Sequence, residues 1–160
     1  MRLCENRCRS YKKRLKESFN VDLLINDVPL ECINHAAVTY QVPATMIISI
    51  LKTEGSKQGS ASKNKDGTID YGPMQINTRW LGKLEKYGIT KEELQYKPCI
   101  NVAVGTWILA QSIASGKDPW HGVGIYHSRT MSFNERYRNK VKGFYDWVNN
   151  IVMPKQKPDK

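Results

Sequence analysis

The sequence predicts one mainly α-helical domain of the α+β class, with a single small β-hairpin or loop element. Three observations support this class. Apolar residues recur at helical spacing through most of the chain, in runs that begin and end at capping signals. One polar, glycine-containing loop interrupts the runs between the second and third predicted helices. The length of 160 residues suits a single hydrophobic core.

The first two predicted helices lie before this loop. The first spans residues 29–41, with Asp27 available as its N-cap. Its expected buried face consists of Cys32, Ile33, Ala36, Ala37 and Tyr40. Pro43 opens the second helix, which ends near Glu54 because Gly55 is a stop signal. One face of this helix, at positions i, i+3, i+4 and i+7, is an apolar stripe of Ile47, Ile50 and Leu51 that continues to Glu54.

The polar loop covers residues 55–68 and is rich in small, turn-forming side chains. Residues 69–77 follow it and predict a short hairpin or extended segment that Gly72 and Pro73 interrupt. We expect little sheet beyond this segment.

Three helices are predicted next, and the third is much longer than the first. A short one contains Trp80, Leu81 and Leu84, and another begins at a capping box of Thr90 and Glu93. The longest apolar helix then ends before Gly116. Its predicted buried stripe is Ile100, Ala103, Val104, Trp107 and Ile108.

The last two helices are also marked by capping signals. Asp118 and Pro119 open a short helix that extends to about Tyr126. Ser132 with Glu135 predicts the cap of the final helix. Its apolar face consists of Tyr137, Val141, Phe144, Tyr145 and Val148.

The net charge of +10 comes mainly from the two ends of the chain. Residues 1–17 carry seven basic and two acidic side chains, and residues 153–160 carry three and one. We therefore expect a flexible basic N-terminal segment at 1–25, a folded domain at 26–152 and a basic tail at 153–160. The mildly basic domain suits an anionic polymer such as cell wall, and nucleic-acid binding through the ends is the weakest candidate function.

The sequence pattern argues against several other classes of protein. No apolar stretch approaches the roughly 20 residues of a membrane helix, so no membrane span is expected. The three histidines stand apart, and no nucleotide-binding fingerprint is present, so we predict neither a metal nor a cofactor. Cys4 and Cys8 are interpreted as incidental. The charged start shows no signal peptide, so an exported protein would need a signal that was removed or replaced, or another route.

Glu54 is the chemically unusual residue. It continues the apolar stripe of its helix, so burial should favour the neutral carboxyl, and the negative end of the helix dipole should act in the same direction. A raised pKa would make Glu54 a proton donor near neutral pH. The alternative is a frayed last turn that leaves Glu54 in solvent.

Four ordered motifs carry a family resemblance. Glu54 is followed by a polar loop and YGPMQIN at residues 71–77, then by CINVAVGTWILAQSI at 99–113, GVGIYHSRT at 122–130 and ERYRNKV at 135–141. This order resembles the lytic transglycosylases of the soluble (SLT) type, in particular the small peptidoglycan-cutting enzymes of type III and type IV secretion and conjugation systems. The resemblance covers about residues 30–145 and implies a lysozyme-like fold.

The resemblance also implies site residues. Glu54 matches the single catalytic acid and base of the family, and Tyr126 the tyrosine near that carboxyl. Tyr137 resembles the tyrosine on the cleft wall. The positions that match the lining of the sugar cleft are Met74, Gln75 and Asn77. For the tyrosines and for Met74, ordinary core packing is the alternative.

The sequence departs from the family pattern in two of these motifs. Gly55 separates Glu54 from Ser56, so a hydroxyl contact to the carboxyl or sugar would come from one position later than usual. His127 and Ser128 follow Tyr126, where the family commonly has Asn-Ala-Gly.

Asp70 leaves the reaction type open. The family mechanism needs one carboxyl, which cleaves between N-acetylmuramic acid and N-acetylglucosamine and forms a 1,6-anhydro ring. If Asp70 faces Glu54, a muramidase that uses water is the alternative. If it only anchors the loop through hydrogen bonds, it has no chemical role. A non-catalytic glycan-binding assembly protein is the candidate from another class.

The resemblance further implies a disulfide and a location. Secretion-type members have cysteines at the places of Cys32 and Cys99, and a bond between them would indicate an oxidising compartment such as the periplasm. The alternative is two free thiols in a cytosolic protein. We expect a monomer that acts on peptidoglycan strands and works with components of a secretion or conjugation machine.

Overall fold

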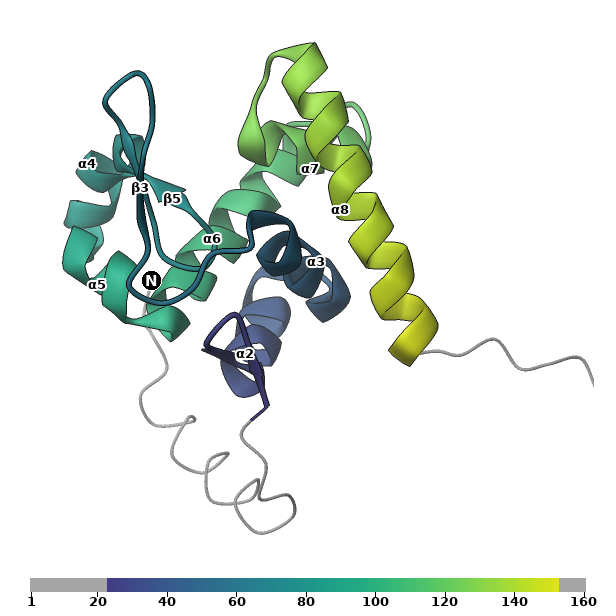
Figure 1. Ribbon diagram of the computed structural model, residues 1–160, viewed down its shortest axis with the longest axis horizontal. Helices are drawn as coiled ribbons and strands as arrows, with labels where there is room; N and C mark the ends of the chain where they lie inside the picture. Colours follow the sequence, from purple (N-terminus) through teal and green to yellow (C-terminus); the bar gives the residue numbers. More distant parts are fainter. Residues whose placement is uncertain (1–22, 153–160) are drawn as a thin grey trace, which may run out of the picture.

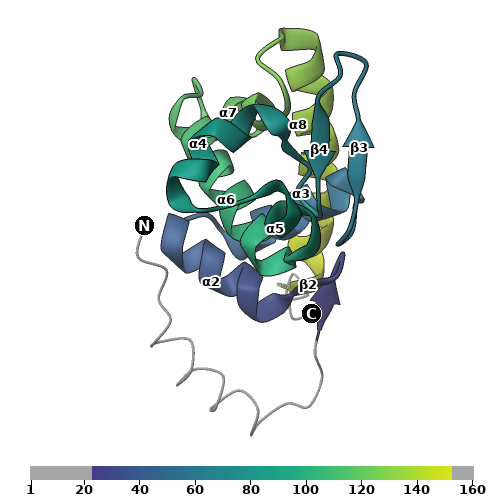
Figure 2. The same cartoon turned by 90° about the vertical axis from the view of Figure 1, so that its left-hand side faces the viewer.

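The computed structural model describes residues 23–152, and it confirms the mainly helical α+β class (Figures 1 and 2). The helices are α2 (Leu30–Tyr40), α3 (Ala44–Glu54), α4 (Leu81–Leu84), α5 (Lys91–Tyr96), α6 (Pro98–Ala114), α7 (Pro119–His127) and α8 (Met131–Val152). Two 3-10 turns, η1 (Thr78–Trp80) and η2 (Glu85–Tyr87), flank α4. None of the helices in this part of the chain has the length and apolar character needed to cross a membrane.

The strands form two small antiparallel sheets. Strand β1 (Leu24–Ile25) pairs with β2 (Val28–Pro29). Strands β3 (Ala61–Lys63), β4 (Ile69–Tyr71) and β5 (Ile76–Asn77) form the second sheet in the order β3-β4-β5. The predicted hairpin at residues 69–77 is confirmed. Strand β3 was not expected, because residues 61–63 belong to the polar loop; their side chains are exposed.

The first sheet corrects the predicted start of α2. Asn26 and Asp27 form its two-residue turn with φ angles of 52° and 65°, a left-handed conformation that Asn and Asp tolerate. Asp27 is therefore committed to the turn and does not cap α2. Pro29 precedes the helix, and no side chain caps its first turn.

Helix α6 is the centre of the core, and it buries more than the predicted stripe. Val104 and Ile108 are buried as expected, but Val102 and Leu109 on other faces are fully buried, and Trp107 is only partly buried. The reason is that α2, α5 and α7 lie on different sides of α6 (Figure 2), and β5 also contacts it. Apolar periodicity could not reveal this, because a helix surrounded by neighbours has no single buried face.

Several local signals were interpreted correctly. Thr90 and Glu93 form the capping box of α5, and Asp118 accepts the N–H of His121 at the start of α7. The predicted apolar face of α8 is confirmed, since Tyr137, Val141 and Val148 are buried and Phe144 and Tyr145 partly so.

The predicted cap of α8 is wrong. The helix begins at Met131, and the carbonyl of Thr130 accepts the N–H groups of Phe133 and Asn134. Ser132 therefore lies inside the first turn, where its side chain cannot act as the N-cap.

A disulfide joins Cys32 in the first turn of α2 to Cys99 in the first turn of α6, with the two Cα atoms 5.3 Å apart. It closes a long loop, because 67 positions separate the two cysteines. Cys4 and Cys8 lie outside the described residues. The bond ties α2 to the central helix at the end opposite to α7.

We predict that this bond contributes about 2–4 kcal/mol to the free energy of unfolding by restricting the unfolded chain. The double substitution Cys32→Ser and Cys99→Ser should lower the urea midpoint accordingly. In the native chain, intact-mass analysis after alkylation without reductant should show that Cys32 and Cys99 are not labelled. Labelling of all four cysteines in the native chain would contradict the bond.

Candidate active site

Glu54 is the last residue of α3, and its position is well fixed. The helix closes with a bond of 3.0 Å from the N–H of Gly55 to the carbonyl of Leu51, and Gly55 takes the left-handed conformation at φ 66°. The hydroxyl of Tyr137 on α8 donates to Oε1 of Glu54 at 2.6 Å. The carboxyl is thus partly buried and tied to another helix, which contradicts the alternative of a frayed, solvated turn.

Burial raises the pKa of Glu54 to about 7. The hydrogen bond from Tyr137 acts in the opposite direction, because it stabilises the carboxylate. The negative charge of Asp70 adds to the rise, and the ammonium of Lys140 lowers the pKa. Lys140 is held nearby through a bond of 3.0 Å from its Nζ to the carbonyl of Thr53. With this pKa, the carboxyl can give up and take back a proton near neutral pH.

Aromatic side chains from α7 and α8 enclose the carboxyl. Tyr126 donates its hydroxyl to the carbonyl of Met74 at 2.7 Å, which joins α7 to the turn after β4. His127 stacks on the ring of Tyr137, with centroids 4.7 Å apart. Burial raises the pKa values of both tyrosines well above 10, and the negative charge of Glu54 acts in the same direction. Both hydroxyls therefore remain hydrogen-bond donors. Burial lowers the pKa of His127, which leaves the ring neutral at pH 7.

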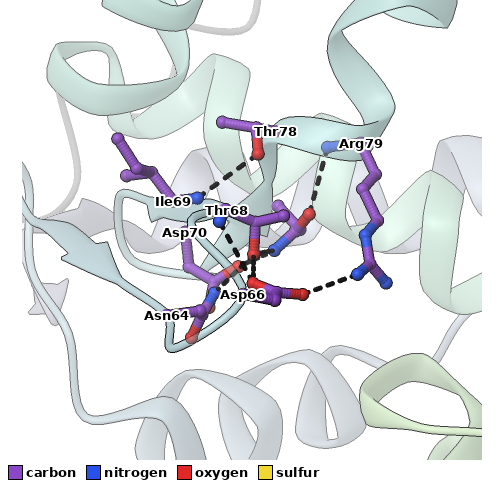
Figure 3. Close-up of polar contacts among 8 residues, drawn as sticks. Asn64, Asp66, Thr68, Ile69, Asp70, Thr78 and Arg79 are labelled. Carbon is purple, nitrogen blue, oxygen red and sulfur yellow. Dashed lines mark hydrogen bonds and ion pairs between the residues drawn. The ribbon is translucent and has the colours of Figure 1, made fainter.

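Asp70 lies on β4 with both carboxylate oxygens engaged (Figure 3). Oδ1 accepts from Nδ2 of Asn77 at 2.7 Å, and Oδ2 accepts from Nδ2 of Asn64 at 2.8 Å. The next residue, Tyr71, is buried at 6% exposure, so the alternation of the strand directs Asp70 away from the core. Its charge acts on the carboxyl of Glu54. Asp70 therefore braces the loop, and its negative charge helps to raise the pKa of Glu54.

A polar network holds the loop that carries Asp70 (Figure 3). The hydroxyl of Thr68 accepts from the amides of Asn64 and Asn77, each at 3.0 Å, and donates to Oδ1 of Asp66 at 2.7 Å. Asp66 also forms an exposed ion pair of 2.6 Å with Arg79. The two amides that orient Asp70 are thus themselves fixed by a third side chain.

Asn101 is a buried support that the sequence interpretation missed. From the first turn of α6, its Oδ1 accepts the N–H of Met74, and its Nδ2 donates to the carbonyls of Tyr71 and Leu94, all within 2.9 Å. Gly72 lies against this amide, with no room for a Cβ atom. A single Asn within an apolar helical run was the available signal, because a buried amide needs partners.

The three residues expected to line the sugar cleft differ in burial and in hydrogen bonding. Met74 is fully buried against Gly105, so the expectation that its side chain lines the cleft is wrong: it fills the core, which was the alternative. Gln75 is partly buried in a left-handed conformation, and its Nε2 donates to the carbonyl of Gly72 at 2.9 Å. Asn77 is partly buried and holds Asp70.

Asn26 is a second residue that was missed. From the β1–β2 turn, its Nδ2 donates to the carbonyl of Leu51 at 2.7 Å and to that of Ser56 at 3.0 Å. It thereby fixes the chain on both sides of Glu54. The hydroxyl of Ser56 has no hydrogen-bond partner within residues 23–152, and its contact with a sugar stays a prediction.

Comparison with known proteins identifies the family. Residues 31–148 match the family described as the transglycosylase SLT domain. The chain belongs to the SLT transglycosylase family. The match contains Glu54 and all four motifs noted in the sequence, and it agrees with the lysozyme-like fold that the resemblance implied.

Several curated SLT relatives cover most of the chain. Invasion protein IagB of Salmonella typhimurium is 32% identical over 124 residues, which are 74% of this chain and 78% of that protein. A peptidoglycan-binding-like protein of Escherichia coli O157:H7 is 29% identical over 158 residues, 89% and 95% of the two chains. Protein IpgF of Shigella flexneri is 28% identical over 111 residues, 69% and 73%.

No three His, Cys, Asp or Glu side chains lie close enough within residues 23–152 to hold a metal ion. The SLT domain brings together a carboxyl of raised pKa at Glu54, two tyrosine hydroxyls and a braced carboxylate at Asp70.

We predict that Glu54→Gln stabilises the protein at pH 8 and has little effect at pH 4.5. The folded carboxyl has a raised pKa, so its ionisation opposes folding, and this cost grows as pH rises from about 4.5 through about 7. Gln avoids the charge and can still accept from Tyr137. Urea unfolding of both proteins should show a difference of about 1–3 kcal/mol at pH 8. An equal difference at the two pH values would contradict the raised pKa.

Proposed function

We propose that the protein is a peptidoglycan lytic transglycosylase, which cleaves the β-1,4 bond between N-acetylmuramic acid and N-acetylglucosamine and forms 1,6-anhydro-N-acetylmuramic acid. The observation that carries the proposal is the partly buried carboxyl of Glu54, with a pKa of about 7 and a hydrogen bond from Tyr137. Membership of the SLT transglycosylase family supports the same reaction class.

The proposed reaction uses one carboxyl twice. Protonated Glu54 gives its proton to the oxygen that links the two sugars, and that bond breaks. The N-acetyl group of the substrate stabilises the cationic sugar. Glu54, now a carboxylate stabilised by Tyr137, takes the proton from the C6 hydroxyl, whose oxygen closes the anhydro ring. No water is consumed, and Glu54 returns to its protonated form.

A muramidase remains the second candidate because Asp70 supplies a second carboxylate whose charge acts on Glu54. Glycosidases with two carboxyls place them about 5–9.5 Å apart, and the second acts as nucleophile or activates water. The amides of Asn64 and Asn77 orient the Asp70 carboxylate, and this supports some part in the reaction. We assign it an electrostatic part, because its charge helps to keep Glu54 protonated.

The proposed setting is the periplasm or another exported location, where the enzyme opens the cell wall locally for a secretion or conjugation apparatus. The resemblance to the small enzymes of such systems supports this setting, as does the name of one relative, an invasion protein. The Cys32–Cys99 bond fits an oxidising compartment. A purely glycan-binding role, which the name of another relative suggests, would not need the raised pKa of Glu54.

We predict that Glu54→Gln lowers the rate of cell-wall digestion by about 100- to 10,000-fold, because the amide can neither donate nor retrieve the proton. The native enzyme should release anhydro-muropeptides, each one water lighter than the hydrolytic product, as measured by mass spectrometry. Digestion at the native rate by this variant would refute the role of Glu54. Reducing-end sugars as the main products would favour the muramidase.

We predict that Asp70→Asn impairs the enzyme by about 3- to 20-fold, since an amide cannot accept from both Asn64 and Asn77. Loss of the negative charge should lower the pKa of Glu54, so the alkaline limb of the pH–rate profile should move to lower pH. Asp66→Asn is the matched control, because it removes a charge from the same loop without facing Glu54. A profile that shifts equally in both variants would contradict the electrostatic part of Asp70.

A further inference from the structure

A groove between α3 and α8 begins beside the proposed catalytic carboxyl and is not used by the mechanism above. Its lining residues are Lys52, Lys140, Gly143, Phe144 and Trp147. The Nζ of Lys140 bonds the carbonyl of Thr53, the residue next to Glu54. Tyr137, which holds Glu54, lies one turn before Lys140 on α8. The groove therefore lies near the end of α3 that carries Glu54, and α3 and α8 lie side by side along it (Figure 1).

The groove is basic and has an apolar wall. Neither Lys52 nor Lys140 forms an ion pair with a carboxylate anywhere in residues 23–152. Trp147 is 54% exposed at the far end, and Phe144 is partly buried between them. The charge of Lys140 also acts on the carboxyl of Glu54, whereas no carboxylate within residues 23–152 pairs with Lys52. These two cations beside exposed aromatic surface favour an extended ligand that carries carboxylates and apolar groups.

Gly143 lines this groove, with open space beside its Cα atom. It lies within the long helix α8, where glycine costs about 0.5–1 kcal/mol relative to alanine. A Cβ atom at Gly143 would meet no atom within 4 Å, so no packing contact among the described residues requires glycine. At Gly122 and Gly124, in contrast, a Cβ would collide with the backbone of Ile113 and with the side chain of Asn134, respectively. The open space at Gly143 is the feature that glycine provides.

We propose that this groove binds the anionic stem peptide carried by the muramic acid next to the scissile bond. The inference rests on the proposed function, since it places that sugar beside Glu54. The peptide is attached to the lactyl group of muramic acid, so it must leave the glycan cleft sideways. From Lys140 to Trp147 the helix rises about 10 Å, which matches about three extended residues. Lys52 and Lys140 meet the peptide carboxylates, and Trp147 covers its apolar side chains.

The test compares two substrates: intact peptidoglycan, and glycan strands whose stem peptides have been removed by an amidase. The measured quantity is the ratio of kcat/KM on intact to kcat/KM on stripped strands. The ratio cancels any effect of a variant on the pKa of Glu54. We expect Gly143→Leu, which fills the groove, and Lys52→Gln, which removes one cation, each to lower the ratio by about fivefold or more.

The matched control is Lys142→Gln, which removes the same charge from α8 outside the groove. Lys142 is exposed, and its Nζ lies 5.9 Å from the ring of Trp120. This control should leave the ratio unchanged. Lys140 is not substituted, because it also holds the end of α3. Thermal unfolding should show Gly143→Leu to be at least as stable as the native chain, since leucine favours a helix.

A binding measurement separates this inference from the proposed reaction. In the Glu54→Gln background, intact strands should bind at least about threefold more tightly than stripped strands, and Gly143→Leu should abolish the difference. If the native enzyme cleaves neither substrate, the proposed function fails while this measurement still tests the groove. Equal binding of intact and stripped strands would overturn the stem-peptide site. An equal loss of kcat/KM on both substrates in Gly143→Leu would also overturn it.

Discussion

The hydrogen bond from Tyr137 to Glu54 sets the geometry on which the rest of the site depends. It requires α8 to cross α3 in one register, because the donor and acceptor are 83 positions apart in the chain. Asn134, one turn earlier and fully buried, secures that register by donating to the carbonyls of His121 and Ser128. The corner between α7 and α8 thus fixes the tyrosine, and the tyrosine fixes the carboxyl.

The pKa of Glu54 results from opposed effects, of which burial is the largest. Burial and the charge of Asp70 disfavour the carboxylate, while Tyr137 and Lys140 favour it. Burial alone would raise the pKa further, which suits proton donation but not proton retrieval. The two partners bring the pKa back towards neutrality, where one group can do both. The cost is a site that opposes folding whenever Glu54 is ionised, which is the kind of local destabilisation that active sites retain.

The sequence predicted most of the helices and the unusual carboxyl, because both depend on local periodicity. The elements that it missed depend on contacts between distant residues. Strands β1 and β2 are only two residues long, too short to show alternation, and the bonds from Asn26 reach 25 and 30 positions along the chain. The position of Met74 beneath the site follows from its packing against Gly105 on α6, which no spacing rule reveals. Asn101 could have been suspected from its polarity alone.

Both functional surfaces inferred for this chain are built on the same pair of helices. The carboxyl ends α3, its hydrogen-bond donor lies on α8, and the basic groove continues along both. Sites on helices are held more rigidly than sites on loops, so the distance from Glu54 to the groove is fixed by helix packing. A substrate that fills both must have its sugar and its side branch at a set spacing. Recognition of the branch would then place the glycosidic oxygen at the proton donor, which is a positioning effect and not merely added affinity.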